Sequence, residues 1–187
     1  MTTRDIVLVA LFTAIMIVLG LIPPVTLGFI PVPITAQSLG PMLAGCIIGA
    51  RRGAASMLLL LLLVAIGLPV LSGGRGGLAV FAGPTAGYLA GWVAGAFVTG
   101  LVAERFVREG QKEILQLAAF LGAAVLGGIV VVYLLGLAWL AYMSGKAFPE
   151  VAVASAVFLP GDLLKAAIAA LAGRAVLAGY PLLHQRA

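Results

Sequence analysis

The chain has 187 residues, of which 63% are apolar and only 9% are charged, with a formal net charge of +5. A soluble domain is typically about 45–50% apolar and about 25% charged, so this composition excludes a soluble globular enzyme, a disordered tail and a disulfide scaffold. The basic residues are scattered between long apolar runs, which indicates the loop bias of a membrane protein and not a nucleic-acid partner.

Residues with catalytic or metal-binding chemistry are scarce. Cys46 is the single cysteine, so it cannot form an internal disulfide, and His184 is the single histidine. The sequence also lacks a Walker A pattern, a G-x-S-x-G string and an H-E-x-x-H string. We therefore expect no enzyme, no catalytic residues, no metal site and no cofactor, and any ATP-driven step must use another subunit.

Apolar stretches long enough to cross a bilayer follow one another along the chain. A bilayer core about 30 Å thick needs roughly 20 helical residues. Prolines at positions 23, 24, 31 and 33 divide the first long run, because proline ends or kinks a helix. The sequence predicts an all-α integral membrane protein with one transmembrane domain, residues 1–187. Its six spans lie near residues 6–22, 35–50, 53–71, 84–103, 117–142 and 151–180.

The basic residues predict the orientation of this bundle. If the N-terminus is cytoplasmic, eight basic residues fall at the inner side, and only Arg75 and Lys146 fall outside. The inner set comprises Arg4, Arg51, Arg52, Arg105, Arg108, Lys112, Arg174 and Arg186. Cytoplasmic loops carry an excess of Lys and Arg, so we expect both termini inside the cell.

Three segments on the outer side do not resemble membrane helix. Residues 23–33 contain four prolines, residues 72–84 contain five glycines, and residues 145–150 form a short polar turn. Flexible backbone at this surface either closes over a ligand or simply links helices. The sequence leaves both interpretations open.

Small residues recur every four positions in the fourth predicted span, at Gly83, Gly87, Gly91 and Gly95. This spacing favours close approach of helices in lipid and predicts compact packing. Tyr88 and Trp92 share the same spacing and place aromatic surface on one side of the helix. They are either core or interfacial packing, or one wall of a ligand site.

The most informative string is LPGDLLK, residues 159–165, within the last predicted span. An ionised side chain near the bilayer centre costs roughly 2.5–3.5 kcal/mol on insertion scales. Asp162 and Lys165 are three residues apart and therefore share one helix face. The pair either recognises a polar ligand or only satisfies itself and orients the helix.

Other polar residues lie near the outer segments. Arg75, in the glycine-rich segment, is either a positive charge facing an anionic ligand or an ordinary solvated loop residue. Thr35 and Gln37 enter the second span directly after the proline-rich segment. Each either donates a hydrogen bond to a ligand or caps that helix.

Taken together, several strings resemble the BioY family, the biotin-binding S components of energy-coupling-factor (ECF) transporters. The likeness covers nearly the whole chain in order. The strings are PVPITAQ (31–37), LAG (43–45), GLPV (67–70), GGRGG (73–77), GPTAGY (83–88) and LPGDLLK (159–165).

The resemblance implies a biotin pocket near the outer face, enclosed by six helices and covered by the first two outer loops, in the cytoplasmic (inner) membrane of a prokaryote. It also implies substrate-binding roles for Asp162, Lys165, Arg75 and Tyr88. We expect Gln37 and Thr85 to bind substrate as well. Ala10 and Ala14 match the small-residue motif that docks a transmembrane coupling subunit (EcfT or BioN type). That subunit in turn binds ATPase subunits (EcfA or BioM type).

The chemistry of biotin agrees with these residues. A carboxylate at Asp162 can accept a urea N–H, while Lys165 or Arg75 can meet the carboxylate or the carbonyl of biotin. Biotin uptake with an ATP-driven module is therefore the first hypothesis. An autonomous secondary transporter of a small organic anion is the alternative, although residues 1–90 and 91–187 form no convincing repeat. A ligand-free membrane assembly factor is a third class.

Overall fold

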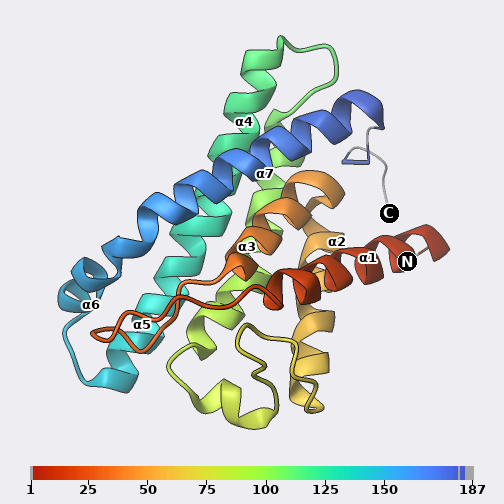
Figure 1. Ribbon diagram of the computed structural model, residues 1–187. Coiled ribbons are helices and arrows are strands. Elements are labelled where there is room, and N and C mark those ends of the chain that lie inside the picture. Colours follow the sequence, from red (N-terminus) through yellow and green to blue (C-terminus); the bar gives the residue numbers. More distant parts are fainter. Residues whose placement is uncertain (1, 181, 184–187) are drawn as a thin grey trace.

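The computed structural model describes residues 2–180 and 182–183, so Arg186 and His184 of the sequence analysis lie outside the described residues. The described part is all-helical, with two isolated β-bridges in its loops. Five helical stretches within it are long and apolar enough to cross a membrane. Figure 1 shows a bundle of long helices with the two longest loops gathered at the same end.

Helix α1 (Thr3–Gly20) corresponds to the first predicted span. Thr2 caps its start, because its hydroxyl accepts a hydrogen bond from Asp5 N at 3.3 Å while the Asp5 carboxylate accepts from Thr2 N at 2.7 Å. The helix ends shortly before the proline pair at positions 23 and 24. Large apolar side chains such as Ile6 and Leu11 are more than half exposed on this helix, as lipid-facing residues are.

The second and third predicted spans correspond to two helical segments that meet at Gly49 and together make up α2 (Leu39–Ala65). A short 3₁₀ turn, η1 (Ala36–Ser38), leads into α2, and Gly49 breaks the helical geometry with φ 82° and ψ −177°. A glycine adopts this conformation without strain. The carboxylate of Glu104 accepts a 2.8 Å hydrogen bond from Ala50 N, a donor freed by the kink.

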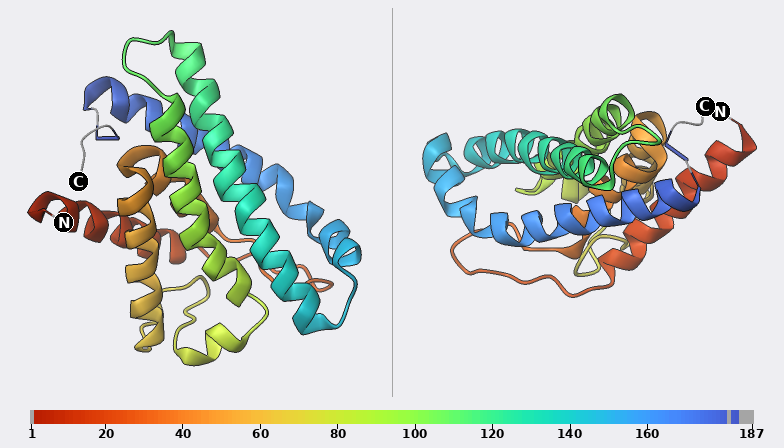
Figure 2. Two further views of the ribbon diagram at one scale, coloured as in Figure 1. Left: turned by 180° about the vertical axis from the view of Figure 1, so that it is seen from behind. Right: turned by 90° about the horizontal axis from the view of Figure 1, so that it is seen from above.

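At this kink α2 folds back on itself. A Cβ placed on Gly53 would lie 3.3 Å from the backbone of Ala44, so the two arms touch beside the kink. Their far ends also meet, because Gln37 Nε2 donates a 3.0 Å hydrogen bond to Val70 O. The helix therefore forms a hairpin of two arms, and Figure 2 shows these arms (orange and yellow-orange) beside α1.

Helix α3 (Ala86–Phe106) confirms the predicted close packing of the small-residue stripe. Added Cβ atoms would lie 3.0 Å from Val132 Cα at Gly91 and 2.7 Å from Gly127 O at Gly95. Gly83, which the sequence analysis placed on the same stripe, lies before the helix. Glycine is required at positions 91 and 95, because the backbone of the neighbouring helix passes too close for a Cβ.

The fifth predicted span is one long rod built from α4 (Glu113–Val125), the π-helical turn η3 (Leu126–Val131) and α5 (Val132–Ser144). The last predicted span comprises α6 (Phe148–Ser155), η4 (Ala156–Phe158) and α7 (Leu159–Gly179). The predicted turn at residues 145–150 is shorter than expected, because α6 begins at Phe148 with a proline in its first turn. Residues 72–84 likewise contain a short 3₁₀ helix, η2 (Leu78–Ala82).

The ends of the bundle differ in character. The loops 21–35 and 66–85 lie at one end, near the start of α7, and the loop 107–112 lies at the other (Figure 1). At that second end the guanidinium of Arg4 stacks 5.1 Å from the ring of Tyr180. Arg52 also reaches Leu182 O at 3.4 Å there. The N-terminal turn and the chain after α7 are therefore held together.

Candidate functional site

A cavity opens at the loop-bearing end of the bundle. It contains about 640 Å³ of atom-free space, part of it open to solvent. Its walls come from the proline-rich loop, η1, the glycine-rich loop, α3, the η3–α5 rod and the start of α7. The lining residues are Val32, Pro33, Ile34, Thr35, Gln37, Ser38, Arg75, Thr85, Tyr88, Leu89, Trp92, Gly128, Val132, Tyr133, Phe158, Asp162 and Lys165. Ligand sites are typically concave and mostly apolar, with a few converging polar groups, and this cavity has that composition.

The two intramembrane charges lie together in this wall. Helix α7 begins at Leu159 with Pro160 in its first turn, and Asp162 and Lys165 lie on one face of its first turns. Lys165 Nζ lies 2.9 Å from Asp162 Oδ1, and the side chains are 16% and 8% exposed. The predicted pairing on one helix face is confirmed.

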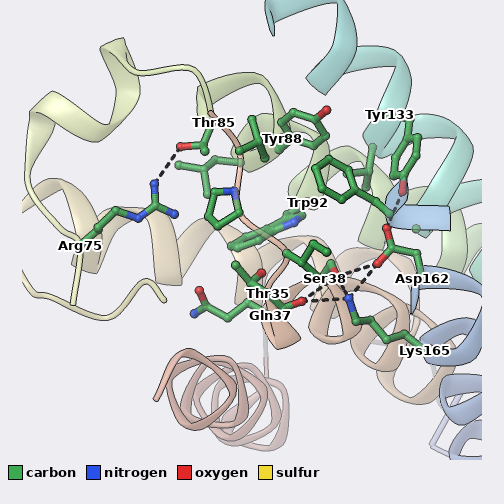
Figure 3. A pocket seen from close by; sticks show the side chains of 17 residues that line it. Thr35, Gln37, Ser38, Arg75, Thr85, Tyr88, Trp92, Tyr133, Asp162 and Lys165 are labelled. Carbon is green, nitrogen blue, oxygen red and sulfur yellow. Dashed lines mark hydrogen bonds and ion pairs between the residues drawn. The ribbon is translucent and has the colours of Figure 1, made fainter. Parts of the chain in front are cut away.

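Neighbouring groups complete the hydrogen bonding of Lys165. Its ammonium donates to Thr35 O at 2.9 Å and to Ser38 Oγ at 2.8 Å, besides Asp162. Protein groups therefore satisfy the hydrogen bonding of the pair, as expected if the pair serves to orient the helix. The pair also borders the cavity, so its two charges are fixed in place in the cavity wall (Figure 3).

Two partners of Asp162 were not found by sequence reasoning. Tyr133 donates a 2.6 Å hydrogen bond to Asp162 Oδ2, and Ser38 Oγ lies 3.1 Å from Oδ1. Both come from other helices, 29 and 124 residues away in the chain. A single tyrosine in an apolar run and a single serine after a loop give no local signal of this contact.

Arg75 occupies another part of the cavity, across from the charged pair in Figure 3. Its Nε donates to Ser72 O at 3.2 Å, and its Nη1 donates to Thr85 Oγ1 at 3.3 Å. Burial lowers the pKa of the guanidinium from its ordinary value, although an arginine stays charged in proteins. The side chain is half-buried and held, so it differs from an ordinary solvated loop arginine.

Gln37 and Thr35 do not act as helix caps. The amide nitrogen of Gln37 donates to Met16 O at 2.9 Å and to Val70 O at 3.0 Å, and its oxygen accepts from Ser72 N at 2.9 Å. Gln37 thus joins α1, η1 and the glycine-rich loop while bordering the cavity. Thr35 contributes its backbone carbonyl to Lys165, and its side chain makes no capping hydrogen bond.

Aromatic rings form a further part of the wall. Tyr88 and Trp92 of α3 are 9% and 7% exposed and line the cavity. The Tyr88 ring meets that of Tyr133 edge to face, with centroids 6.5 Å apart. The rings are packed in the core and also face the cavity, and their role as a ligand wall stays a prediction.

Both long loops, residues 21–35 and 66–85, contribute to the cavity. The proline-rich loop contributes Val32 to Ile34, and the glycine-rich loop contributes Arg75. These loops are therefore part of the site wall as well as connections between helices. Ala10 and Ala14 are placed differently, on the exposed side of α1 and away from the lining residues.

Comparison with known proteins gives consistent matches over this length. The chain matches the BioY family over residues 1–182. It is 62% identical over 187 residues to the biotin transporter BioY of Rhizobium etli, covering 100% of both chains. It is 49% identical over 183 residues to the biotin transporter BioY of Rhodobacter capsulatus, covering 92% of this chain and 93% of that protein.

A solved structure agrees with the sequence matches. The crystal structure at 2.1 Å of the S-component for biotin from an ECF-type ABC transporter superposes with a TM-score of 0.86, at 33% identity and 95% coverage of each chain. These relatives are transporters, which confirms the expectation that this chain is no enzyme. Its sequence over residues 1–182 and its helical fold together establish that the chain belongs to the BioY family.

Proposed function

We propose that this chain is the substrate-binding membrane subunit for biotin uptake and that it captures biotin at the outer face. The observation that carries the proposal is the fixed Asp162–Lys165 pair in the wall of a largely apolar cavity. Charges in a membrane segment are expensive unless function requires them. Membership of the BioY family, and relatives named as biotin transporters, support the same ligand.

The cavity suits the two polar ends and the apolar body of biotin. Asp162 accepts a urea N–H, and Lys165, whose three N–H groups already bind protein acceptors, holds that carboxylate in place. Arg75, with Thr85 beside it, meets the valerate carboxylate across the cavity. The bicyclic ring and the chain lie against Tyr88 and the apolar residues of the wall. Gln37 keeps a role at the site by holding the glycine-rich loop, and thereby Arg75, in place.

The proposed topology has six crossings with both termini inside the cell. The hairpin of α2 supports this count, because its two arms begin and end at the same end of the bundle. Basic residues at the opposite end support the orientation, since cytoplasmic loops are rich in them. Arg51 and Arg52 follow the kink at that end, and Arg108 and Lys112 lie in its loop. The membrane is the cytoplasmic membrane of a prokaryote.

Delivery inward depends on a coupling module in this proposal. The sequence contains no ATP-binding motif of its own. The exposed Ala10 and Ala14, one turn apart on α1, offer a close-approach surface for the coupling subunit. ATPase subunits on that coupling subunit then supply the energy.

Thermal unfolding of the detergent-purified chain tests the ligand. Biotin is expected to raise the midpoint in proportion to the logarithm of its concentration above the dissociation constant, and other water-soluble vitamins are not. Asp162→Asn is expected to lose this shift, whereas Glu113→Gln, a carboxylate-to-amide change at the inner end, keeps it. No shift with biotin in the unsubstituted chain contradicts the proposal.

Transport assays separate the two energy sources. Biotin uptake by proteoliposomes is expected only when coupling and ATPase subunits are present together with ATP. Uptake by the chain alone, driven by a proton gradient, contradicts the coupled mechanism and favours the autonomous transporter. Ala10→Trp is expected to abolish copurification with the coupling subunit while leaving the biotin-dependent thermal shift intact.

A further inference from the structure

The two tryptophans of this chain differ in their hydrogen bonding. The indole N–H of Trp139 donates a 2.9 Å hydrogen bond to Gly83 O. Trp92 is only 7% exposed, yet its indole N–H donates to no residue among those the structure describes. A buried tryptophan N–H usually has a partner. The contrast therefore points to an acceptor that the protein itself does not supply.

The position of Trp92 indicates where that acceptor comes from. Trp92 lines the cavity, and Figure 3 shows its indole between Arg75 and the Asp162–Lys165 pair. The Tyr88 hydroxyl also lacks a hydrogen bond, but protein atoms enclose it, next to Ser155. The indole nitrogen of Trp92 is not among these enclosed atoms, and Trp92 is a lining residue of the cavity.

The chemistry of the indole restricts what it can bind. Tryptophan has one N–H donor and no acceptor, so its partner must be an acceptor. Nearby protein acceptors are already engaged, since Thr35 O accepts from Lys165 and Asp162 accepts from three donors. An acceptor oxygen on a cavity ligand would satisfy the indole without breaking these contacts.

We propose that Trp92 is a ligand-contacting, specificity-determining residue whose N–H donates to an acceptor oxygen of the bound molecule. This inference rests on the proposed biotin-binding function. Biotin offers two such acceptor groups, the urea carbonyl and the carboxylate. Trp92 thus selects for ligands with an acceptor in the middle of the cavity, in addition to the selection by charge at Asp162, Lys165 and Arg75.

A substitution that removes the N–H and keeps the ring shape provides the test. In a Trp139→Phe background, Trp92 is the only tryptophan, and it is replaced by benzothienylalanine, in which sulfur stands in place of the N–H. Biotin affinity is expected to fall roughly three- to tenfold for a carbonyl acceptor and more for a carboxylate. The unfolding midpoint without ligand is expected to stay unchanged, because the N–H makes no hydrogen bond in the protein.

Two analogues distinguish the oxygen that is bound. In 2-iminobiotin an imino group replaces the urea oxygen, and in biotinamide an uncharged amide replaces the carboxylate. If the urea oxygen is the acceptor, the benzothienylalanine replacement causes no further loss with 2-iminobiotin. If the carboxylate is the acceptor, the loss persists with 2-iminobiotin and shrinks with biotinamide. Either pattern supports the donor role of Trp92.

The outcomes that overturn the inference are separate from those that overturn the function. Unchanged biotin affinity in the benzothienylalanine variant overturns the donor role alone. A lower unfolding midpoint without ligand also overturns it, because the N–H then stabilises the protein itself. If neither the unsubstituted chain nor the Trp139→Phe parent binds biotin, the proposed function and this inference are both overturned. Trp92→Phe, which keeps an aromatic wall, is expected to show the same loss of affinity as the isostere.

Discussion

The phenol of Tyr133 donates a 2.6 Å hydrogen bond to Oδ2 of Asp162, joining α5 to the first turn of α7. The other carboxylate oxygen of Asp162 meets Ser38 and Lys165. Three donors from three segments therefore fix the orientation of one carboxylate in the cavity wall. Preorganisation of this kind lowers the cost of binding, because the charged group is already oriented when the ligand arrives.

Replacing Tyr133 by phenylalanine tests this positioning role. We expect Tyr133→Phe to weaken biotin binding roughly tenfold or more, since a hydrogen bond to a charged group is worth about 1.5–3 kcal/mol. Titration of labelled biotin into the purified variant measures the effect. Tyr142→Phe, at an exposed tyrosine of the same helix, serves as the control. Equal affinity in the two variants would refute the role of Tyr133.

A second prediction separates the role of the Asp162–Lys165 pair in protein stability from its role in biotin binding. Each single change, Asp162→Asn or Lys165→Met, is expected to lower the unfolding midpoint by several degrees, because an unpaired charge remains within the membrane segment. The double variant is expected to recover most of that loss without regaining biotin binding. Thermal unfolding and biotin titration of all three proteins measure this. Recovery of binding in the double variant would show that the pair is only structural.

Arg75 makes a prediction about the charge of the ligand. We expect Arg75→Gln to reduce the affinity for biotin at least tenfold and to change that for biotinamide little, because only biotin carries a carboxylate for the guanidinium. Lys146→Gln removes an exposed cation from the same end of the bundle and should change neither affinity. An equal loss for both ligands would mean that Arg75 supports the loop and does not read the carboxylate.

A buried ion pair at the opposite end makes a prediction about folding alone. Arg52 Nε lies 2.7 Å from Asp5 Oδ1, and both side chains are less than a tenth exposed. Asp5→Asn is expected to lower the unfolding midpoint by several degrees, because it leaves the Arg52 charge in a buried site without its carboxylate.

The exposed pair Lys146–Glu150 provides the matched control for Asp5. These side chains are 57% and 58% exposed, and exposed pairs contribute only about 0–1 kcal/mol. Glu150→Gln should therefore leave the unfolding midpoint nearly unchanged. A shift as large as that of Asp5→Asn would indicate that the burial of the Asp5–Arg52 pair is not what stabilises the protein.

Much of the architecture follows from local sequence. Runs of apolar residues long enough for a bilayer predict membrane helices because transfer free energy sums along a continuous stretch. The spacing of Asp162 and Lys165 predicts a shared helix face because three residues make nearly one turn. The proline- and glycine-rich strings predict the two long loops, because proline and glycine interrupt helices. The structure confirms these helical, pairing and loop expectations.

Other features depend on contacts between distant segments. The two predicted spans meet at Gly49 in a sharp reversal, and the backbone N–H of Ala50 that this break frees donates to Glu104, 54 residues away. Gln37 joins three segments through backbone groups that no side-chain pattern reveals. The start of α6 at Phe148 was not predicted, because the polar composition of residues 145–150 indicates a turn.

The sequence by itself determined the membrane class, the helical fold, the paired charges and the family, since each rests on composition, spacing or strings that lie along the chain. Only the tertiary structure decided which groups surround those charges, namely Tyr133 and Ser38, and that a cavity lies beside them. It also separated the bonded Trp139 from the open Trp92. The physical reason is that hydrogen bonds and cavities form between residues that packing brings together. The local sequence around one partner does not indicate which distant residue it will contact.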